Sequence, residues 1–229
     1  MDRIILIETS TSLCSTALVE GDRLIAYKES EKPKSQAALT ALFIKEMLDG
    51  NNLSAKDCNA VCVSMGPGSY TGLRVGTSTA KGLCFGAGLP LIAVGTLNTL
   101  VWQAIDEGLA KDVRYIVPMV DARRMEVYSA VFTSDGRQIS DTEAKIIEEG
   151  SFGDILSEGK VLFIGDGAEK CKTVLSSGNA SFVQCYPKAS AMLHPAIEEY
   201  KEKRFKDIAY FEPFYLKQFV ATVSEKKLF

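Results

Sequence analysis

Three turns in this sequence carry side chains that could hold the phosphates of a nucleotide. Each turn follows an apolar run, RIILI, YIVPMV or VLFI, of the kind that forms a buried strand. An acidic side chain can hold a water of a Mg²⁺ ion, and glycine lets backbone N–H groups come close to phosphate oxygens. The candidate residues are Glu8, Thr9, Thr11, Asp121, Gly165 and Gly167.

Each of these turns departs from what a nucleotide site needs. Glu8 stands where a shorter Asp is common, and the three residues after it supply hydroxyls but no glycine. Asp121 is followed by ARRM, whose bulky side chains should obstruct a nucleotide. Gly165 and Gly167 also fit an ordinary tight turn. We interpret Glu8, Asp121 and Arg123 as remnants of an ancestral site or as a salt-bridged wall, and we expect no cofactor of the chain's own.

The segment GPGSYTGLRVGTSTAKGLCFGAG, residues 66–88, is rich in glycine but matches no phosphate motif. Counted from Gly68, the P-loop pattern puts Leu73 and Arg74 where glycine and lysine are required. Counted from Gly66, the dinucleotide pattern puts Thr71 at its last glycine. We therefore interpret the segment as a tight strand-to-helix turn followed by a helix.

The outward face of that helix is made of small residues, and Arg74 and Lys81 lie along one edge. A solvated face would be rich in Glu and Lys, and an interior glycine costs about 1 kcal/mol relative to alanine. Small residues allow another helix to approach closely, although the glycines could equally serve packing within the lobe. A second predicted helix, from Ser35 to about Asp49, is apolar nearly all round, which is typical of a helix buried on more than one side.

These two helices form the predicted partner interface. We expect one side of each helix to pack on a sheet and the other side to contact a neighbouring helix or another chain. The predicted interface residues are Ala37, Ala41, Ile44, Leu48, Tyr70, Arg74, Val75, Ser78, Thr79 and Gly82.

The order of elements predicts a duplicated α/β fold. Three β-rich runs, a helix, a strand, a helix and a strand occur in series, and the series restarts near residue 112. This is the organisation of the actin-like (ribonuclease H-like) two-lobe fold, with mixed sheets flanked by helices. We predict a first lobe at 1–108 and a second at 109–206, with residues 207–229 packing back on the first.

Composition narrows the class of protein further. The chain has 229 residues, 46% of them hydrophobic, and a net charge of −3, which lacks the basic excess of a protein that binds nucleic acid alone. His194 is the single histidine and the six cysteines form no CxxC pair, so we expect reduced thiols and no metal site. No apolar run is long enough to cross a membrane, and we expect a cytoplasmic protein.

Four segments together resemble the bacterial TsaB (YeaZ) family across nearly the whole chain. They are IETSTSLCSTAL, SMGPGSYTGLRVGTSTAKGL, VDARRMEVYSAVF and EPFYLK. The resemblance implies a subunit of the machinery that makes N6-threonylcarbamoyladenosine in tRNAs that read codons beginning with A. It further implies a heterodimer with the catalytic paralogue TsaD through first-lobe helices, an ATPase partner of the TsaE type, and contact with tRNA through the complex.

The resemblance also bears on catalysis. TsaD carries a metal held by paired histidines, which would lie on the helix that begins near Ser35, and this chain has KPKSQAALTAL there. We therefore expect a non-catalytic scaffold that forms a homodimer in isolation, with ATP or ADP at most at the joint of a complex. Two rival hypotheses are a small-molecule kinase or ATPase, which would turn over Mg-ATP alone, and a metal-dependent glycoprotease, which would need a metal and finds no HExxH here.

Overall fold

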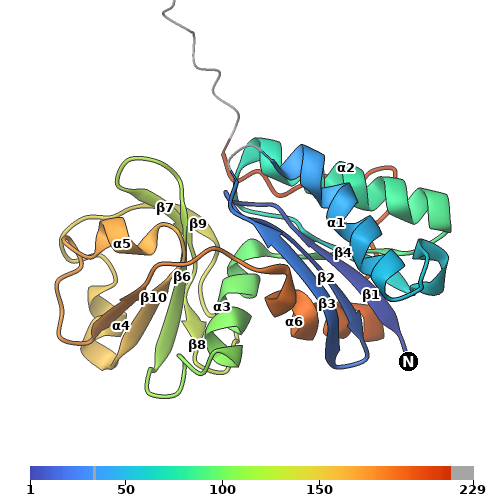
Figure 1. Cartoon of the computed structure of the whole chain (residues 1–229). Helices are drawn as coiled ribbons and strands as arrows, with labels where there is room; N and C mark the ends of the chain where they lie inside the picture. Colours follow the sequence, from blue (N-terminus) through green and yellow to red (C-terminus); the bar gives the residue numbers. More distant parts are fainter. Residues whose placement is uncertain (33–34, 218–229) are drawn as a thin grey trace, which may run out of the picture.

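The structure, a computed structural model, describes residues 1–32 and 35–217 and consists of two lobes side by side (Figure 1). The sheet of the first lobe is mixed, because β1 pairs antiparallel with β2 and parallel with β4. In spatial order it contains β3 (Arg23–Ser30), β2 (Cys14–Glu20), β1 (Arg3–Glu8), β4 (Ala60–Ser64) and β5 (Leu91–Val94).

The second sheet repeats this plan. Its central strand pairs antiparallel with the next strand in the chain and parallel with β10. The order is β11 (Ala180–Val183), β10 (Val161–Ile164), β6 (Tyr115–Asp121), β7 (Glu126–Ser129) and β9 (Glu143–Ile146), and β8 (Phe132–Thr133) also pairs with β6. The mixed, duplicated sheets confirm the predicted actin-like two-lobe fold.

Two long helices cover one face of the first sheet. Helices α1 (Gln36–Gly50) and α2 (Tyr70–Ala87) bury their apolar stripes on β1 and β4 in one core cluster. The Ser69 hydroxyl accepts the Gly72 N–H at 3.3 Å and caps the start of α2. Gly88, in the left-handed region at φ 69°, ends it. Ser35 precedes α1, but its hydroxyl donates to the Lys32 carbonyl instead of capping the helix.

The two lobes exchange a helix. Helix α3 (Thr96–Asp106) follows the last strand of the first sheet, yet its apolar face packs on β6 and β10 of the second. The 3₁₀ helix η2 (Ala189–Met192) and α6 (Leu193–Lys201) follow the second sheet and cover the remaining face of the first. The two helices meet between the lobes (Figure 1). The predicted ranges 1–108 and 109–206 therefore do not coincide with the packing units.

Several elements of the second lobe are shorter than predicted. The run MEVYSAVFTS is divided into β7 and β8 by a break at Ala130 and Val131, although both strands pair with β6 in one register. Helix α5 (Ala168–Cys171) ends well before Ser177, where serine and glycine disfavour helix. Helix α4 (Gly153–Glu158) and a 3₁₀ turn, η1 (Ala55–Asp57), complete the described elements.

Residues 206–217 run back along the first lobe. The Lys206 N–H donates to the Leu91 carbonyl at 2.8 Å, and the Phe214 N–H donates to the Met65 carbonyl at 2.7 Å. Ile208 and Phe211 pack on the core cluster under α1 and α2. The rest of the predicted C-terminal segment, 218–229, lies outside the described residues.

Candidate functional site

A cleft of about 1040 Å³ lies between the lobes, where a nucleotide would sit in an actin-like fold. One wall is formed by the turn after β1 and the start of α2, and the other by the turn after β6 and by Asp166. Residues 214–217 reach across the opening, and Lys217 forms an ion pair with Glu126 of the second lobe. All three predicted phosphate turns thus lie at or beside one cleft.

The polar groups of the first-lobe turn are directed into the protein. Glu8 is fully buried, and desolvation raises the pKa of its carboxyl to about 7. Its Oε1 accepts the Ser10 N–H at 2.7 Å. The Thr9 hydroxyl donates to the Gly72 carbonyl at 2.8 Å, which ties this turn to α2. Within the described part of the chain, the hydroxyl of Thr11 and the Oε2 of Glu8 have no hydrogen-bond partner.

Three glycines of the segment 66–88 hold this turn against α2. A Cβ on Gly68 would overlap the Ser10 carbonyl oxygen, and a Cβ on Gly72 would overlap the Thr9 carbonyl oxygen. A Cβ on Gly76 would overlap the Thr9 hydroxyl. These glycines therefore serve close packing within the lobe and leave no phosphate-sized gap between the turn and the helix.

The second-lobe turn is filled by its own side chains. Lys170 forms an ion pair with Asp121, whose Oδ1 also accepts the Arg123 N–H at 2.9 Å. Arg123 and Arg124 both have left-handed backbones, at φ 70° and 50°, and their side chains are exposed in the cleft. Of the three residues predicted to form a salt-bridged wall, only Asp121 has an ion pair among the described residues.

The third predicted turn is also structural. A Cβ on Gly165 would overlap the Met119 carbonyl oxygen, and a Cβ on Gly167 would press on Val127 at 2.8 Å. Between them, Asp166 accepts the Asp121 N–H at 2.9 Å, and burial raises the pKa of its carboxyl to about 6. Both glycines let the turn after β10 pack tightly on the neighbouring strands.

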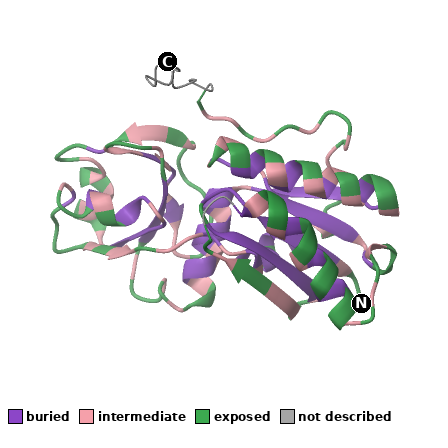
Figure 2. Ribbon diagram, turned by 45° about the horizontal axis from the view of Figure 1, so that its top comes forward, coloured by how far each residue is buried: buried purple, intermediate pink, exposed green. Residues whose placement is uncertain are grey.

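The outer faces of α1 and α2 form a second candidate site, which we call the α1–α2 face. Figure 2 shows both helices exposed on the side that points away from the sheet. The face is small or apolar over most of its length and consists of Ala37, Ala38, Ala41, Leu42, Val75, Ser78, Thr79, Gly82, Phe85 and Gly86. The described residues leave open space around any Cβ added to Gly82 or Gly86.

The structure corrects part of the predicted interface. Ile44 and Leu48 are 2% and 6% exposed and belong to the core under α1, so the prediction that they face a partner is wrong. Thr40, Ile44, Met47 and Leu48 are buried, whereas Ala37 and Ala41, which lie on the first two turns of the helix, are exposed.

Tyr70 and Arg74 lie at the edge of the α1–α2 face nearest the cleft and already have contacts. The Tyr70 ring packs on Tyr215 at a centroid distance of 4.7 Å, and the Arg74 guanidinium lies 4.0 Å above the Tyr70 ring. Farther along the same edge, Lys81 donates to the Ala209 carbonyl at 3.3 Å. This edge is therefore covered by the returning C-terminal segment.

Ala38, Leu42, Phe85 and Gly86 belong to this face but were not among the predicted interface residues. Phe85 is the largest of them. Its side chain is 86% exposed, which is unusual for a phenylalanine on a helix that is otherwise well packed. Leu42 on α1 is 45% exposed. The available signal was a large aromatic residue between Gly82 and Gly86, on the stripe already assigned to a partner.

The remaining predictions concern metals and membranes. Within residues 1–32 and 35–217, no group of three or more His, Cys, Asp or Glu side chains could hold a metal ion. His194 lies 3.5 Å from Asp106 and stacks on Trp102, away from the cleft. In the same part of the chain, no helix is long and apolar enough to span a membrane.

Comparison with known proteins gives consistent matches. A family model described as TsaD, tRNA N6-adenosine threonylcarbamoyltransferase, matches residues 34–223. The tRNA threonylcarbamoyladenosine biosynthesis protein TsaB of Escherichia coli is 31% identical over 235 residues, which cover 96% of each chain. TsaB of Bacillus subtilis is 32% identical over 130 residues, covering 56% of this chain and 54% of that protein.

Among solved structures, YeaZ from Pseudomonas aeruginosa superposes with a TM-score of 0.82 at 21% identity, over 94% of this chain and 100% of that one. A second Pseudomonas aeruginosa structure, described as similar to peptidase YEAZ, gives a TM-score of 0.84 at 22% identity, over 95% of this chain and 100% of that one. At these identities the superpositions show a shared fold.

Proposed function

The chain belongs to the TsaB family of tRNA threonylcarbamoyladenosine biosynthesis proteins, and we propose that it is the non-catalytic scaffold subunit of that system. In this proposal it binds and activates a TsaD-type subunit. That subunit forms N6-threonylcarbamoyladenosine in tRNAs that read codons beginning with A. The contact surface is the α1–α2 face.

The single observation that carries the proposal is the composition of the α1–α2 face. Neighbouring helices expose alanines, glycines, Leu42 and Phe85 side by side, in a chain of which 24% of residues are charged. An exposed apolar patch of this kind is typical of a protein interface. Gly82 and Gly86 add open space, which lets a partner helix approach the backbone of α2.

The cleft supports a role without catalysis. Its phosphate turns are closed by internal contacts of Thr9, Asp121 and the glycines, and Arg123 and Arg124 occupy the opening. We therefore propose no nucleotide of the chain's own, and place any ATP or ADP at a joint between subunits. The helix α1 carries no histidine, and the single His194 stacks on Trp102.

The remaining partners follow from the same role. We propose that a TsaE-type ATPase joins the heterodimer and that tRNA is reached through the complex, since the chain's net charge is −3. The isolated chain would cover the α1–α2 face by forming a homodimer, which the TsaD-type subunit displaces. The place of action would be the cytoplasm, where the tRNA substrate is found.

Light scattering on mixtures with the TsaD-type subunit of the same organism tests the proposal. The wild-type chain should form a heterodimer with this subunit. The Gly82→Glu variant should not form it, because the glutamate side chain would fill the open space on α2 and place a charge there. Ser176→Glu is the matched control, since it places the same charge on an exposed position of the second lobe. Two wild-type subunits that remain separate would overturn the proposal.

The rival ATPase hypothesis is tested in the same preparation. The isolated chain should not turn over Mg-ATP above the rate of a preparation that carries Asp121→Asn. Turnover by the wild-type chain that this substitution abolishes would favour the kinase or ATPase hypothesis. Modification of tRNA by the reconstituted system should be lost with Gly82→Glu and kept with Ser176→Glu.

A further inference from the structure

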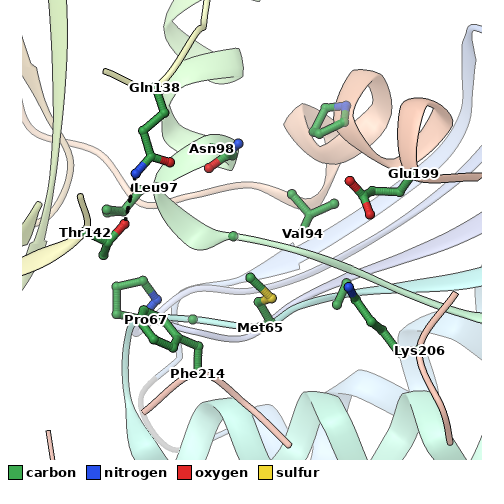
Figure 3. Close-up of a pocket in the computed structure, with 14 residues that line it drawn as sticks. Met65, Pro67, Val94, Leu97, Asn98, Gln138, Thr142, Glu199, Lys206 and Phe214 are labelled. Atoms are coloured by element: carbon green, nitrogen blue, oxygen red, sulfur yellow. Dashed lines mark hydrogen bonds between the residues drawn. The ribbon is translucent and has the colours of Figure 1, made fainter. Parts of the chain in front are cut away.

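A second pocket lies at the junction of the lobes, beside the cleft, with which it shares Phe214, and apart from the α1–α2 face. Its volume is about 240 Å³, and Figure 3 shows its lining side chains. They come from segments far apart in sequence: Met65 and Pro67 after β4, Asn98 at the start of α3, Glu199 on α6, and Phe214. Gln138 and Thr142 close it from the second lobe. The pocket is therefore formed only when both lobes and the C-terminal segment are in place.

Opposite charges face this pocket without neutralising one another. Glu199 and Lys206 lie on the same side of it in Figure 3, yet their charged atoms do not come within the 4.0 Å of an ion pair. Among the described residues, no carboxylate pairs with the half-buried Lys206. The Oε1 of Glu199 lies 2.9 Å from the Arg204 guanidinium, which leaves its Oε2 available to a ligand. The Lys206 ammonium group is therefore available to pair with an anionic group of a ligand.

The opposite side of the pocket offers hydrogen bonds without charge. Figure 3 shows the Asn98 amide directed toward the space above Met65 and Val94, and that amide has no partner among the described residues. Gln138 donates to Thr142 at 3.3 Å and to the Ser140 carbonyl at 2.7 Å, which leaves its own amide oxygen as an acceptor. The floor of Met65 and Val94 is apolar.

We propose that this pocket binds a small zwitterion of the α-amino acid class. The ligand carboxylate would pair with Lys206, the ammonium group would pair with the free Oε2 of Glu199, and the remainder would lie over Met65 toward the Asn98 amide. The volume of about 240 Å³ is below the range of about 300–1,000 Å³ that is typical of sites for drug-sized ligands. It suits a compact molecule with both charges on one carbon. This site is independent of the proposed partner interface.

Calorimetric titration of the full chain with each of the twenty standard L-amino acids tests the proposal. At least one amino acid should bind, and Lys206→Met should weaken it by about tenfold or more. Lys201→Met is the matched control, because it removes the same charge from the exposed end of α6 and should leave binding unchanged. Circular dichroism of each variant establishes that it is folded.

The two charges can be separated by a ligand analogue. The analogue is the hydroxy acid that matches the bound amino acid, with a hydroxyl group in place of the ammonium group. The wild-type chain should bind this hydroxy acid more weakly than the amino acid. The Glu199→Gln variant should bind the two ligands equally well. The proposal is overturned if no amino acid binds at about 10 mM. It is also overturned if Lys206→Met and Lys201→Met bind equally well.

Discussion

At the scale of single residues, the glycines of the segment 66–88 belong to different groups. Gly68, Gly72 and Gly76 touch the turn after β1 so closely that a Cβ would overlap it. Gly82 and Gly86 lie on the outer side of α2, with open space where a Cβ would point. The first group is required by the fold of the lobe. The second group destabilises the helix and has no compensating contact in the described chain.

The same substitution should therefore have opposite effects at the two kinds of glycine. Gly72→Ala should lower the free energy of unfolding by about 1–3 kcal/mol, because its Cβ would overlap the Thr9 carbonyl. Gly82→Ala should raise that free energy by up to about 1 kcal/mol, which corresponds to an increase in Tm of about 2–4 °C. Urea denaturation of both variants is the measurement. A loss of stability in Gly82→Ala would show that this glycine also serves the lobe.

Glu8 gives a prediction about pH. Burial raises the pKa of its carboxyl from 4.5 to about 7, so the folded state holds this proton more tightly than the unfolded state. The free energy of unfolding should then fall as pH rises from about 4.5 to about 7, by on the order of 3 kcal/mol from this group. Below about pH 4.5 the carboxyl is protonated in both states, so the contribution is fully present and no longer changes with pH.

Glu8→Gln isolates this effect, because its amide oxygen can still accept the Ser10 N–H. The difference in unfolding free energy between Glu8→Gln and the wild-type chain should increase with pH over this range and favour the variant. Asp166 titrates in the same direction, with a pKa of about 6, and cancels in the difference. A difference that does not change with pH would contradict the buried, uncharged Glu8.

At the scale of elements, sequence patterns located the strands and helices of the first lobe well, because caps and glycines mark their ends. They failed on which part of α1 is buried. Ala37, Ala41, Ile44 and Leu48 follow one another at helical spacing, so spacing alone could not show that the first two are exposed and the last two buried. Contacts with β2 decide this, and these contacts are set by the tertiary structure.

Paired substitutions on α1 can verify which of its residues are buried. Ile44→Ala should lower the free energy of unfolding by about 2–5 kcal/mol, since Ile44 is in the core. Ala41→Glu should change it by less than about 0.5 kcal/mol, because Ala41 is exposed, and should instead weaken self-association. Chemical denaturation and light scattering measure the two effects. Equal destabilisation by both changes would mean that Ala41 is buried as well.

The candidate sites were predictable to different degrees. The absence of glycine after Glu8 and the ARRM sequence after Asp121 predicted obstructed phosphate turns, and in the structure Thr9 and Asp121 of these turns are bound to Gly72 and Lys170. Phe85 and the lobe-junction pocket were not foreseen. That pocket combines Asn98, Gln138, Glu199 and Lys206, and only the packing of α3 and α6 brings these residues together.

At the scale of the whole molecule, the exchange of α3 and α6 makes the lobes depend on one another. Without α6, the face of the first sheet that includes Leu6, Cys62 and Ile92 would be exposed. Without α3, the second sheet would expose Ile116 and Ile164. Each half of the chain therefore lacks the helix that covers one face of its own sheet.

A split of the chain at Gly108 should therefore give fragments that fold only together. Fragment 1–108 expressed alone should be insoluble or unfolded, because the face covered by Met192 and Leu193 is bare. Co-expression with fragment 109–229 should restore a soluble complex with the circular dichroism spectrum of the intact chain. A folded 1–108 fragment would show that α6 is dispensable for the first lobe.

The helix exchange also has a mechanical consequence. Opening the cleft would separate α3 from η2 and α6, which contact one another between the lobes, and would break the Lys217–Glu126 ion pair across the cleft. Enzymes that close around a substrate need an opening motion that costs little free energy. A chain whose lobes exchange helices in this way is better suited to act as a rigid support for a more mobile partner protein.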